Sequence, residues 1–169
     1  MMNLLIDIGN SSAKVAISEN KKIIEDFRFA ELDTNKILDI INEYKIQNSA
    51  LSNVSTDNEK LKKILIENTS FYSFSNEIRI PFNCPYKLTD VGDDRLALMA
   101  AAYYDFPAEN VLVIDMGTCI TYDIKTSNNN YKAGGISPGI RMRIKSISDG
   151  AFKLNEITPA YPESLIASD

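Results

Sequence analysis

The chain has 169 residues, of which 44% are hydrophobic, and a formal net charge of −5, which fits one large or two small globular domains with a real core. An acidic balance argues against a nucleic-acid partner, because a phosphate backbone requires a basic face. No apolar run approaches membrane-spanning length and no segment resembles a signal peptide. We therefore expect a cytoplasmic protein with no membrane partner.

Histidine is absent from the chain. This absence excludes hydrolases built on a His base, His-ligated zinc sites and phosphohistidine chemistry. Acid–base chemistry must therefore come from carboxylates, Lys or Tyr. Cys84 and Cys119 lie in no metal-binding or redox spacing, so we expect two reduced, inert thiols.

A three-stranded meander opens the predicted fold. A continuous apolar run predicts a strand over 2–8 that is buried on both faces. The strand is followed by others over 13–18 and 22–29, and a helix with an apolar face begins near Asp33. The next expected elements are a strand over 49–54, a helix over 56–68 and weaker strands over 71–74 and 78–81. Alternating helices and strands indicate an α/β domain with a partly parallel sheet.

The segment over 82–92 contains a proline and no periodicity, so we expect a loop that reaches outward. A helix with Leu96 and Met99 on its apolar stripe follows this loop. Asp94 and Arg95 then fall in its first turn, where the positive end of the helix dipole favours an anion.

A second meander follows a domain boundary over 107–110. Its expected elements are strands over 111–116, 118–124 and 131–136, a glycine-rich turn over 134–139 and a helix over 140–151. The remaining 153–169 segment is irregular and rich in proline. Because the second unit lacks the elements that complete the first, we expect the chain to be a truncated copy of a longer protein.

Two segments repeat one pattern, an apolar strand, an Asp, one residue, a Gly and a polar residue. They are Asp7-Ile8-Gly9-Asn10-Ser11 and Asp115-Met116-Gly117-Thr118. Glycine permits positive φ and the close approach of an anion, and hydroxyl, amide and backbone N–H groups can bind that anion. A carboxylate would repel bare phosphate, so a bridging Mg²⁺ is implied. One copy alone is more simply a polar hairpin, but two copies favour phosphate binding.

The two Asp-Gly hairpins resemble the phosphate loops of the acetate and sugar kinase, Hsp70 and actin superfamily, in which paired domains clamp a nucleotide. Together with Gly92-Asp93-Asp94-Arg95 and Gly134-Gly135-Ile136-Ser137-Pro138-Gly139, their order and spacing resemble those of type III pantothenate kinases. The resemblance implies an actin-like, ribonuclease H-type α/β fold. It places a first domain over 1–107 and an incomplete second domain over 108–169.

The resemblance also implies an activity, the ATP-dependent phosphorylation of pantothenate to 4′-phosphopantothenate, the first step of coenzyme A biosynthesis. The implied protein is a homodimer that uses Mg²⁺ with ATP and a monovalent cation, K⁺ or NH₄⁺. Asp94 would be the base, Asp7 would lie near Mg²⁺, and Asp115 would help to bind the monovalent cation. The implied nucleotide-binding residues are Asp7, Ile8, Gly9, Asn10, Ser11, Ser12, Ala13, Lys14 and Thr118. The implied acceptor-binding residues are Tyr86, Gly92, Asp93, Asp94 and Arg95.

Two other functions stay open at this point. A kinase of the same superfamily that acts on a sugar or a carboxylate would keep both Asp-Gly loops but need a different acceptor segment over 86–95. A non-catalytic, nucleotide-binding accessory protein would bind ATP and transfer phosphate to no acceptor.

Overall fold

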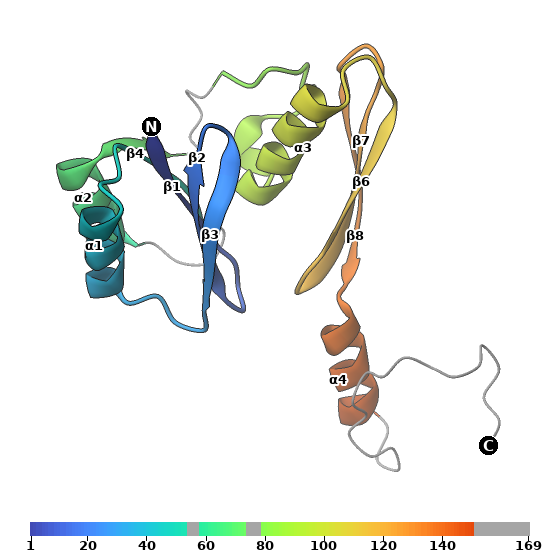
Figure 1. The fold of residues 1–169 in the computed structure, drawn as a ribbon. Coiled ribbons are helices and arrows are strands. Elements are labelled where there is room, and N and C mark those ends of the chain that lie inside the picture. The colour runs from blue at the N-terminus through green and yellow to red at the C-terminus, as the bar shows by residue number, and fades with distance from the viewer. Residues whose placement is uncertain (54–57, 74–78, 151–169) are drawn as a thin grey trace.

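The structure is a computed structural model, and it describes residues 1–53, 58–73 and 79–150. In these ranges the chain forms a five-stranded sheet of order β3-β2-β1-β4-β5 and a three-stranded sheet of order β6-β7-β8. Helix α3 lies between the two sheets, and α1 and α2 cover the opposite face of the first sheet (Figure 1). No helix in the described ranges is both long and apolar enough to cross a membrane.

The first sheet begins with the predicted meander. Its elements are β1 (Met2–Ile8), β2 (Ala13–Glu19), β3 (Lys22–Phe29), α1 (Thr34–Glu43), β4 (Asn48–Asn53), α2 (Glu59–Asn68) and β5 (Ser70–Ser73). Strand β1 pairs antiparallel with β2 and parallel with β4, which pairs parallel with β5. A meander extended by parallel strands through helical crossovers has the topology of a ribonuclease H-type sheet. The predicted actin-like α/β fold class is confirmed.

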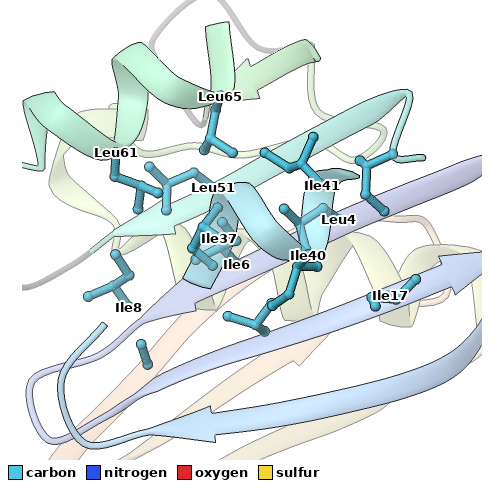
Figure 2. Packing of buried hydrophobic residues seen from close by; sticks show 13 residues of the cluster. Leu4, Ile6, Ile8, Ile17, Ile37, Ile40, Ile41, Leu51, Leu61 and Leu65 are labelled. Atoms are coloured by element: carbon cyan, nitrogen blue, oxygen red, sulfur yellow. The ribbon is translucent and has the colours of Figure 1, made fainter. Parts of the chain in front are cut away.

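Alternate residues of β1 build the main core. Leu4, Ile6 and Ile8 are buried against residues of α1 and α2 that include Ile37 and Leu61 (Figure 2). The prediction that β1 is buried on both faces is wrong, because Leu5 on the other face is 41% exposed. Helices α1 and α2 cover only the face that carries Leu4, and α3 packs against β4.

The second half of the described chain also follows the predicted order. Its elements are a short 3₁₀ turn (Leu88–Asp90), α3 (Asp93–Asp105), β6 (Val111–Met116), β7 (Cys119–Lys125), β8 (Tyr131–Pro138) and α4 (Ile140–Gly150). The predicted strand over 78–81 is wrong for residues 79–81, which form no strand, and residue 78 lies outside the described ranges. Residues 151–169, including the predicted irregular segment, also lie outside them.

The 82–92 segment folds back onto the second sheet, so the prediction of an outward loop is wrong. The Asn83 backbone N–H donates to the Asn129 carbonyl at 2.9 Å, and the Asn83 carbonyl accepts from the Tyr131 N–H at 2.8 Å. Phe82 and Val91 are buried in a second core cluster together with Tyr131. The apolar side chains of this segment therefore close the space between α3 and the second sheet.

The predicted glycine-rich turn over 134–139 is also wrong, since residues 134–138 lie in β8. A side chain at Gly134 would collide with the Tyr122 carbonyl on β7, and one at Gly139 would collide with the Gly117 carbonyl. No glycine in the described ranges has positive φ. Close approach of two backbones, rather than turn geometry, explains these two glycines.

The inner face of the second sheet, which packs against α3, is unusually polar. Strand register places Asp115 opposite Thr121, Val113 opposite Asp123 and Val111 opposite Lys125, so these side chains share one face. Lys125 is fully buried, and its ammonium group donates to the carbonyls of Phe106 at 2.8 Å and Glu109 at 3.0 Å. These carbonyls lie just past the end of α3, where the helix dipole favours a cation.

The outer face of the second sheet carries exposed apolar side chains. They are Leu112, Ile114, Met116 and Ile124. Burial along β6 therefore alternates with the two-residue period of a strand, and the half-buried residues lie on the face that packs against α3.

We expect Leu4→Ala to lower the free energy of unfolding by about 2–5 kcal/mol, because Leu4 is fully buried and its removal leaves a cavity in the core. Leu5→Ala is the matched control on the same strand and should cost less than about 1 kcal/mol. Urea unfolding followed by circular dichroism measures both. Equal losses for the two variants would contradict the assigned register of β1.

Candidate functional site

The first Asp-Gly hairpin joins β1 to β2. Asp7 lies opposite Lys14 in the register, and the Lys14 ammonium contacts the Asp7 carboxylate at 3.2 Å. The turn is closed by the Gly9 N–H, which donates to the Ser12 carbonyl at 3.1 Å. Both side chains of the ion pair are partly exposed, 56% for Lys14 and 38% for Asp7. The pair is therefore worth no more than about 1 kcal/mol and can exchange partners.

The second Asp-Gly hairpin joins β6 to β7 through a shorter turn. Asp115 lies opposite Thr121 at the end of β6, and the Gly117 N–H donates to the Cys119 carbonyl at 2.9 Å. Neither Gly9 nor Gly117 has positive φ. Neither glycine uses the positive φ that it permits, and the shared feature is a polar turn that follows an Asp near the end of a strand.

The two hairpins meet at their tips. The hydroxyls of Ser11 and Thr118, which are 107 positions apart in the chain, form a hydrogen bond of 2.7 Å. Both side chains are exposed. The contact brings together two residues that the sequence assigns to nucleotide binding. The other residues assigned to this role fall along the first hairpin, where Ile8 and Ala13 are buried, Gly9 and Ser12 are partly buried, and Asn10 and Lys14 are exposed.

The predicted acceptor segment forms the start of α3. Gly92 is the N-cap residue, and Asp93 and Asp94 lie in the first turn. The Asp94 carboxylate accepts a hydrogen bond from the Arg95 backbone N–H at 2.8 Å. A Cβ atom on residue 92 would lie 2.5 Å from this carboxylate, so glycine leaves the space that Asp94 occupies. The positive end of the α3 dipole favours an acidic side chain at this position.

The Arg95 side chain crosses to the second sheet. Its guanidinium group donates from Nε to Asp123 at 2.8 Å and from one Nη to the other carboxylate oxygen at 2.5 Å. The Arg95 side chain is 12% exposed and that of Asp123 only 3%. The hydrogen bond to Asp123 raises the pKa of Arg95 above its usual value. This bidentate pair is the main charged contact between α3 and β7.

Tyr131 completes this buried group. Its hydroxyl donates to the Asp123 carboxylate at 2.9 Å. Burial raises the pKa of Tyr131, and the hydrogen bond to Asp123 raises it further, so the phenol remains a donor across the working pH range.

Tyr86 rests on the same buried group. Its ring packs edge-on against Tyr131 with centroids 5.6 Å apart. Its hydroxyl accepts a hydrogen bond from the Ala133 N–H on β8 at 3.2 Å, and the residue is 40% exposed. Two predicted acceptor residues, Tyr86 and Arg95, are therefore held by the same part of the second sheet.

Sequence reasoning missed Asp123 and Tyr131. The available signal was the alternation of polar and apolar residues along β7. Every second residue, namely Thr121, Asp123 and Lys125, lies on the same face of the hairpin as Asp115. Asp123 lies two residues beyond Thr121, so the anchor of the acceptor residues is about 7 Å along the strand from the pair that contains Asp115. Asp123, the partner of the acceptor residue Arg95, and Asp115 of the second phosphate loop thus lie on one face of one hairpin.

Metal binding at the two loops requires oxygen atoms from outside the protein. No group of three or more carboxylates or thiols that could hold a metal ion occurs within the described ranges. Each loop offers one carboxylate, Asp7 or Asp115, beside hydroxyl groups. This donor set fits Mg²⁺, which binds through one or two carboxylates and takes its other ligands from phosphates and water.

The two cysteines are unpaired and half-buried, as expected. The Cys84 thiol lies 3.5 Å from the Tyr86 carbonyl. Cys119 follows the second loop on the inner face of β7.

Comparison with known proteins places this geometry in a family. A sequence profile described as type III pantothenate kinase matches residues 3–169. The chain is 37% identical to a type III pantothenate kinase of Christiangramia forsetii and 36% identical to one of Phocaeicola vulgatus. The first alignment covers 98% of this chain and 69% of the relative, and the second covers 96% and 70%.

A solved structure from Campylobacter jejuni, described as a Baf family transcriptional activator, is 32% identical to this chain. It superimposes with a TM-score of 0.55 over 95% of this chain and 68% of that one. The profile match and the two kinase relatives identify the chain as a member of the type III pantothenate kinase family.

Proposed function

We propose that this chain transfers the γ-phosphoryl group of ATP to pantothenate and so makes 4′-phosphopantothenate, the first step of coenzyme A biosynthesis. Membership of the type III pantothenate kinase family supports the reaction and the substrate. The structural observation that carries the proposal is the 2.7 Å contact between Ser11 and Thr118. Two phosphate loops that meet at their tips can surround the phosphates of a single nucleotide.

In the proposed reaction, the primary hydroxyl oxygen of pantothenate bonds to the γ-phosphorus, and the bond from that phosphorus to the β–γ bridging oxygen breaks. ADP leaves, and Asp94 accepts the hydroxyl proton. A weak carboxylate base suffices, because in a loose transition state the proton departs late. Backbone N–H and hydroxyl groups of the two loops orient the phosphates, and Tyr86 and Arg95 line the acceptor side.

Two cations are part of the proposal. Mg²⁺ bound with ATP would neutralise phosphate charge beside Asp7, and K⁺ or NH₄⁺ would lie near Asp115. Lys14 can turn from Asp7 to a phosphate, because their ion pair is exposed and weak. The proposed setting is the cytoplasm, where ATP is available, with no nucleic-acid or membrane partner.

A homodimer is the proposed assembly, as the family resemblance implies. Exposed apolar side chains on the outer face of the second sheet, such as Leu112 and Met116, offer surface that a partner could bury.

We expect the purified chain to convert pantothenate to 4′-phosphopantothenate when it is given ATP, Mg²⁺ and K⁺, with the product measured by mass spectrometry. Chelation of Mg²⁺ should abolish turnover, and exchange of K⁺ for Na⁺ should lower it. Phosphorylation of a sugar or a carboxylate instead would indicate another kinase of the superfamily. ATP binding without transfer to any acceptor would indicate an accessory protein.

Asp94→Asn should lower kcat by about 10²–10⁴-fold, because the amide cannot accept the hydroxyl proton. ATP affinity, measured by calorimetry, should change less than about twofold, since the change is isosteric. Asp90→Asn is the matched control, because Asp90 is an exposed carboxylate just before the same helix. Turnover of Asp94→Asn close to that of the wild type would rule out Asp94 as the base.

Light scattering after gel filtration at micromolar concentration should give about twice the chain mass of 18.9 kDa. A single species of chain mass would contradict the homodimer. Met116→Lys should lower the mass toward that of one chain if the outer face of the second sheet forms the interface.

A further inference from the structure

Three predicted acceptor residues depend on contacts from the second sheet or on each other. Arg95 is bound by Asp123, Tyr86 packs on Tyr131, and the Arg95 N–H holds the Asp94 carboxylate. We propose that Asp123, supported by Tyr131, is the positioning residue of the acceptor site. The proposal rests on the proposed kinase function, but it concerns residues to which that function assigns no role.

The geometry of the pair fixes the guanidinium group in the plane of the carboxylate. Two parallel N–H···O bonds from Nε and one Nη allow one orientation only. Asp123 cannot turn away, because its side chain is 3% exposed and its Oδ1 also accepts from the Tyr131 hydroxyl. Arg95 is therefore held by a rigid partner rather than by solvent.

The backbone of Arg95 contacts the proposed base. The Asp94 carboxylate bonds to the Arg95 backbone N–H at 2.8 Å. A contact chain thus runs from Tyr131 through Asp123 and Arg95 to Asp94. Any displacement of the first turn of α3 would carry the N–H group, and the carboxylate with it, away from the acceptor hydroxyl. Misplacement of a reacting group by about 1 Å can cost on the order of 10²-fold in rate.

Tyr131 connects the two sides of the acceptor site. Its hydroxyl donates a hydrogen bond to Asp123, the partner of Arg95. Its ring packs edge-on against the ring of Tyr86, with the two centroids 5.6 Å apart. Loss of the hydroxyl should therefore loosen Arg95 and leave Tyr86 in place. Neither Asp123 nor Tyr131 lies in the two phosphate loops, so ATP binding should be unaffected.

Steady-state kinetics of Asp123→Asn test the proposal. The amide keeps the shape of the side chain but loses the charge that holds the guanidinium group. We expect KM for pantothenate to rise at least about tenfold and kcat to fall, while KM for ATP changes less than about twofold. Tyr131→Phe should shift the same constants in the same direction by a smaller factor.

Lys125→Met is the matched control. Lys125 is a buried charge two residues away on the same strand and face, but its ammonium group bonds to the Phe106 and Glu109 carbonyls beyond the end of α3 and to the carbonyl of the adjacent Thr126. It should lower the melting temperature and leave both KM values unchanged. If Asp123→Asn behaves in the same way, its role is only structural and the proposal is overturned.

A double-mutant cycle separates positioning from general damage. Arg95→Lys keeps the charge but loses the planar fork, so it should raise KM for pantothenate in the wild-type background. In the Asp123→Asn background, Arg95→Lys should raise KM for pantothenate little further, because the planar guanidinium group has no carboxylate partner there. Additive effects would overturn the proposal. If Asp123→Asn fails to fold, the same cycle with Tyr131→Phe decides.

Hydrogen exchange distinguishes failure of this inference from failure of the proposed function. If the wild-type chain does not phosphorylate pantothenate, the kinase proposal fails, but amide exchange over 92–97 still tests the anchor. Asp123→Asn should speed exchange there at least about tenfold relative to the wild type, while Lys125→Met should not. Unchanged exchange in Asp123→Asn would overturn the positioning role.

Discussion

The bidentate pair between Arg95 and Asp123 joins α3 to the second sheet, and the arrangement of the candidate site depends on it. Burying two charges costs several kcal/mol per ion, which only near-ideal geometry can offset. Both oxygens of Asp123 receive N–H bonds, and Tyr131 adds a third donor. Loss of one partner would leave an uncompensated buried charge, at a cost of about 3–5 kcal/mol. The start of α3, which carries the proposed base, is thus held from the second sheet.

The two halves of the candidate site differ in rigidity for a physical reason. The phosphate loops are held by exposed contacts, such as Lys14 with Asp7 and Ser11 with Thr118. Such contacts are weak in water, so an incoming phosphate can replace them at little cost. The acceptor side is held by buried contacts that water cannot compete for. We infer that a nucleotide reorganises its loops on binding, whereas the acceptor meets residues that are already in position.

Local patterns in the sequence predicted much of the fold. Helical spacing located α1, apolar runs located β1 and β6, and the repeated Asp-Gly pattern found two hairpins that meet in space. Two of the errors involve contacts between distant segments. The 82–92 segment folds inward because of its pairing with Asn129 and Tyr131, and Gly134 is required by the approach of Tyr122. Neither partner can be read from the local sequence.

The sequence did not predict that Asp123 and Lys125 are buried, because β7 reverses the usual burial pattern of a strand. This reversal points to function. In β7 the apolar Ile124 is 40% exposed, while its charged neighbours are buried, the reverse of the usual strand pattern. An apolar inner face would pack against α3 without the cost of burying charges. A strand that nevertheless buries Thr121, Asp123 and Lys125 in a row therefore loses stability unless these groups have specific partners. Lys125 finds carbonyls at the end of α3, and Asp123 finds the arginine beside the proposed base. Departures from simple patterning are expected where a site must be held in place, and here they lie along the strand that joins the second phosphate loop to the acceptor residues.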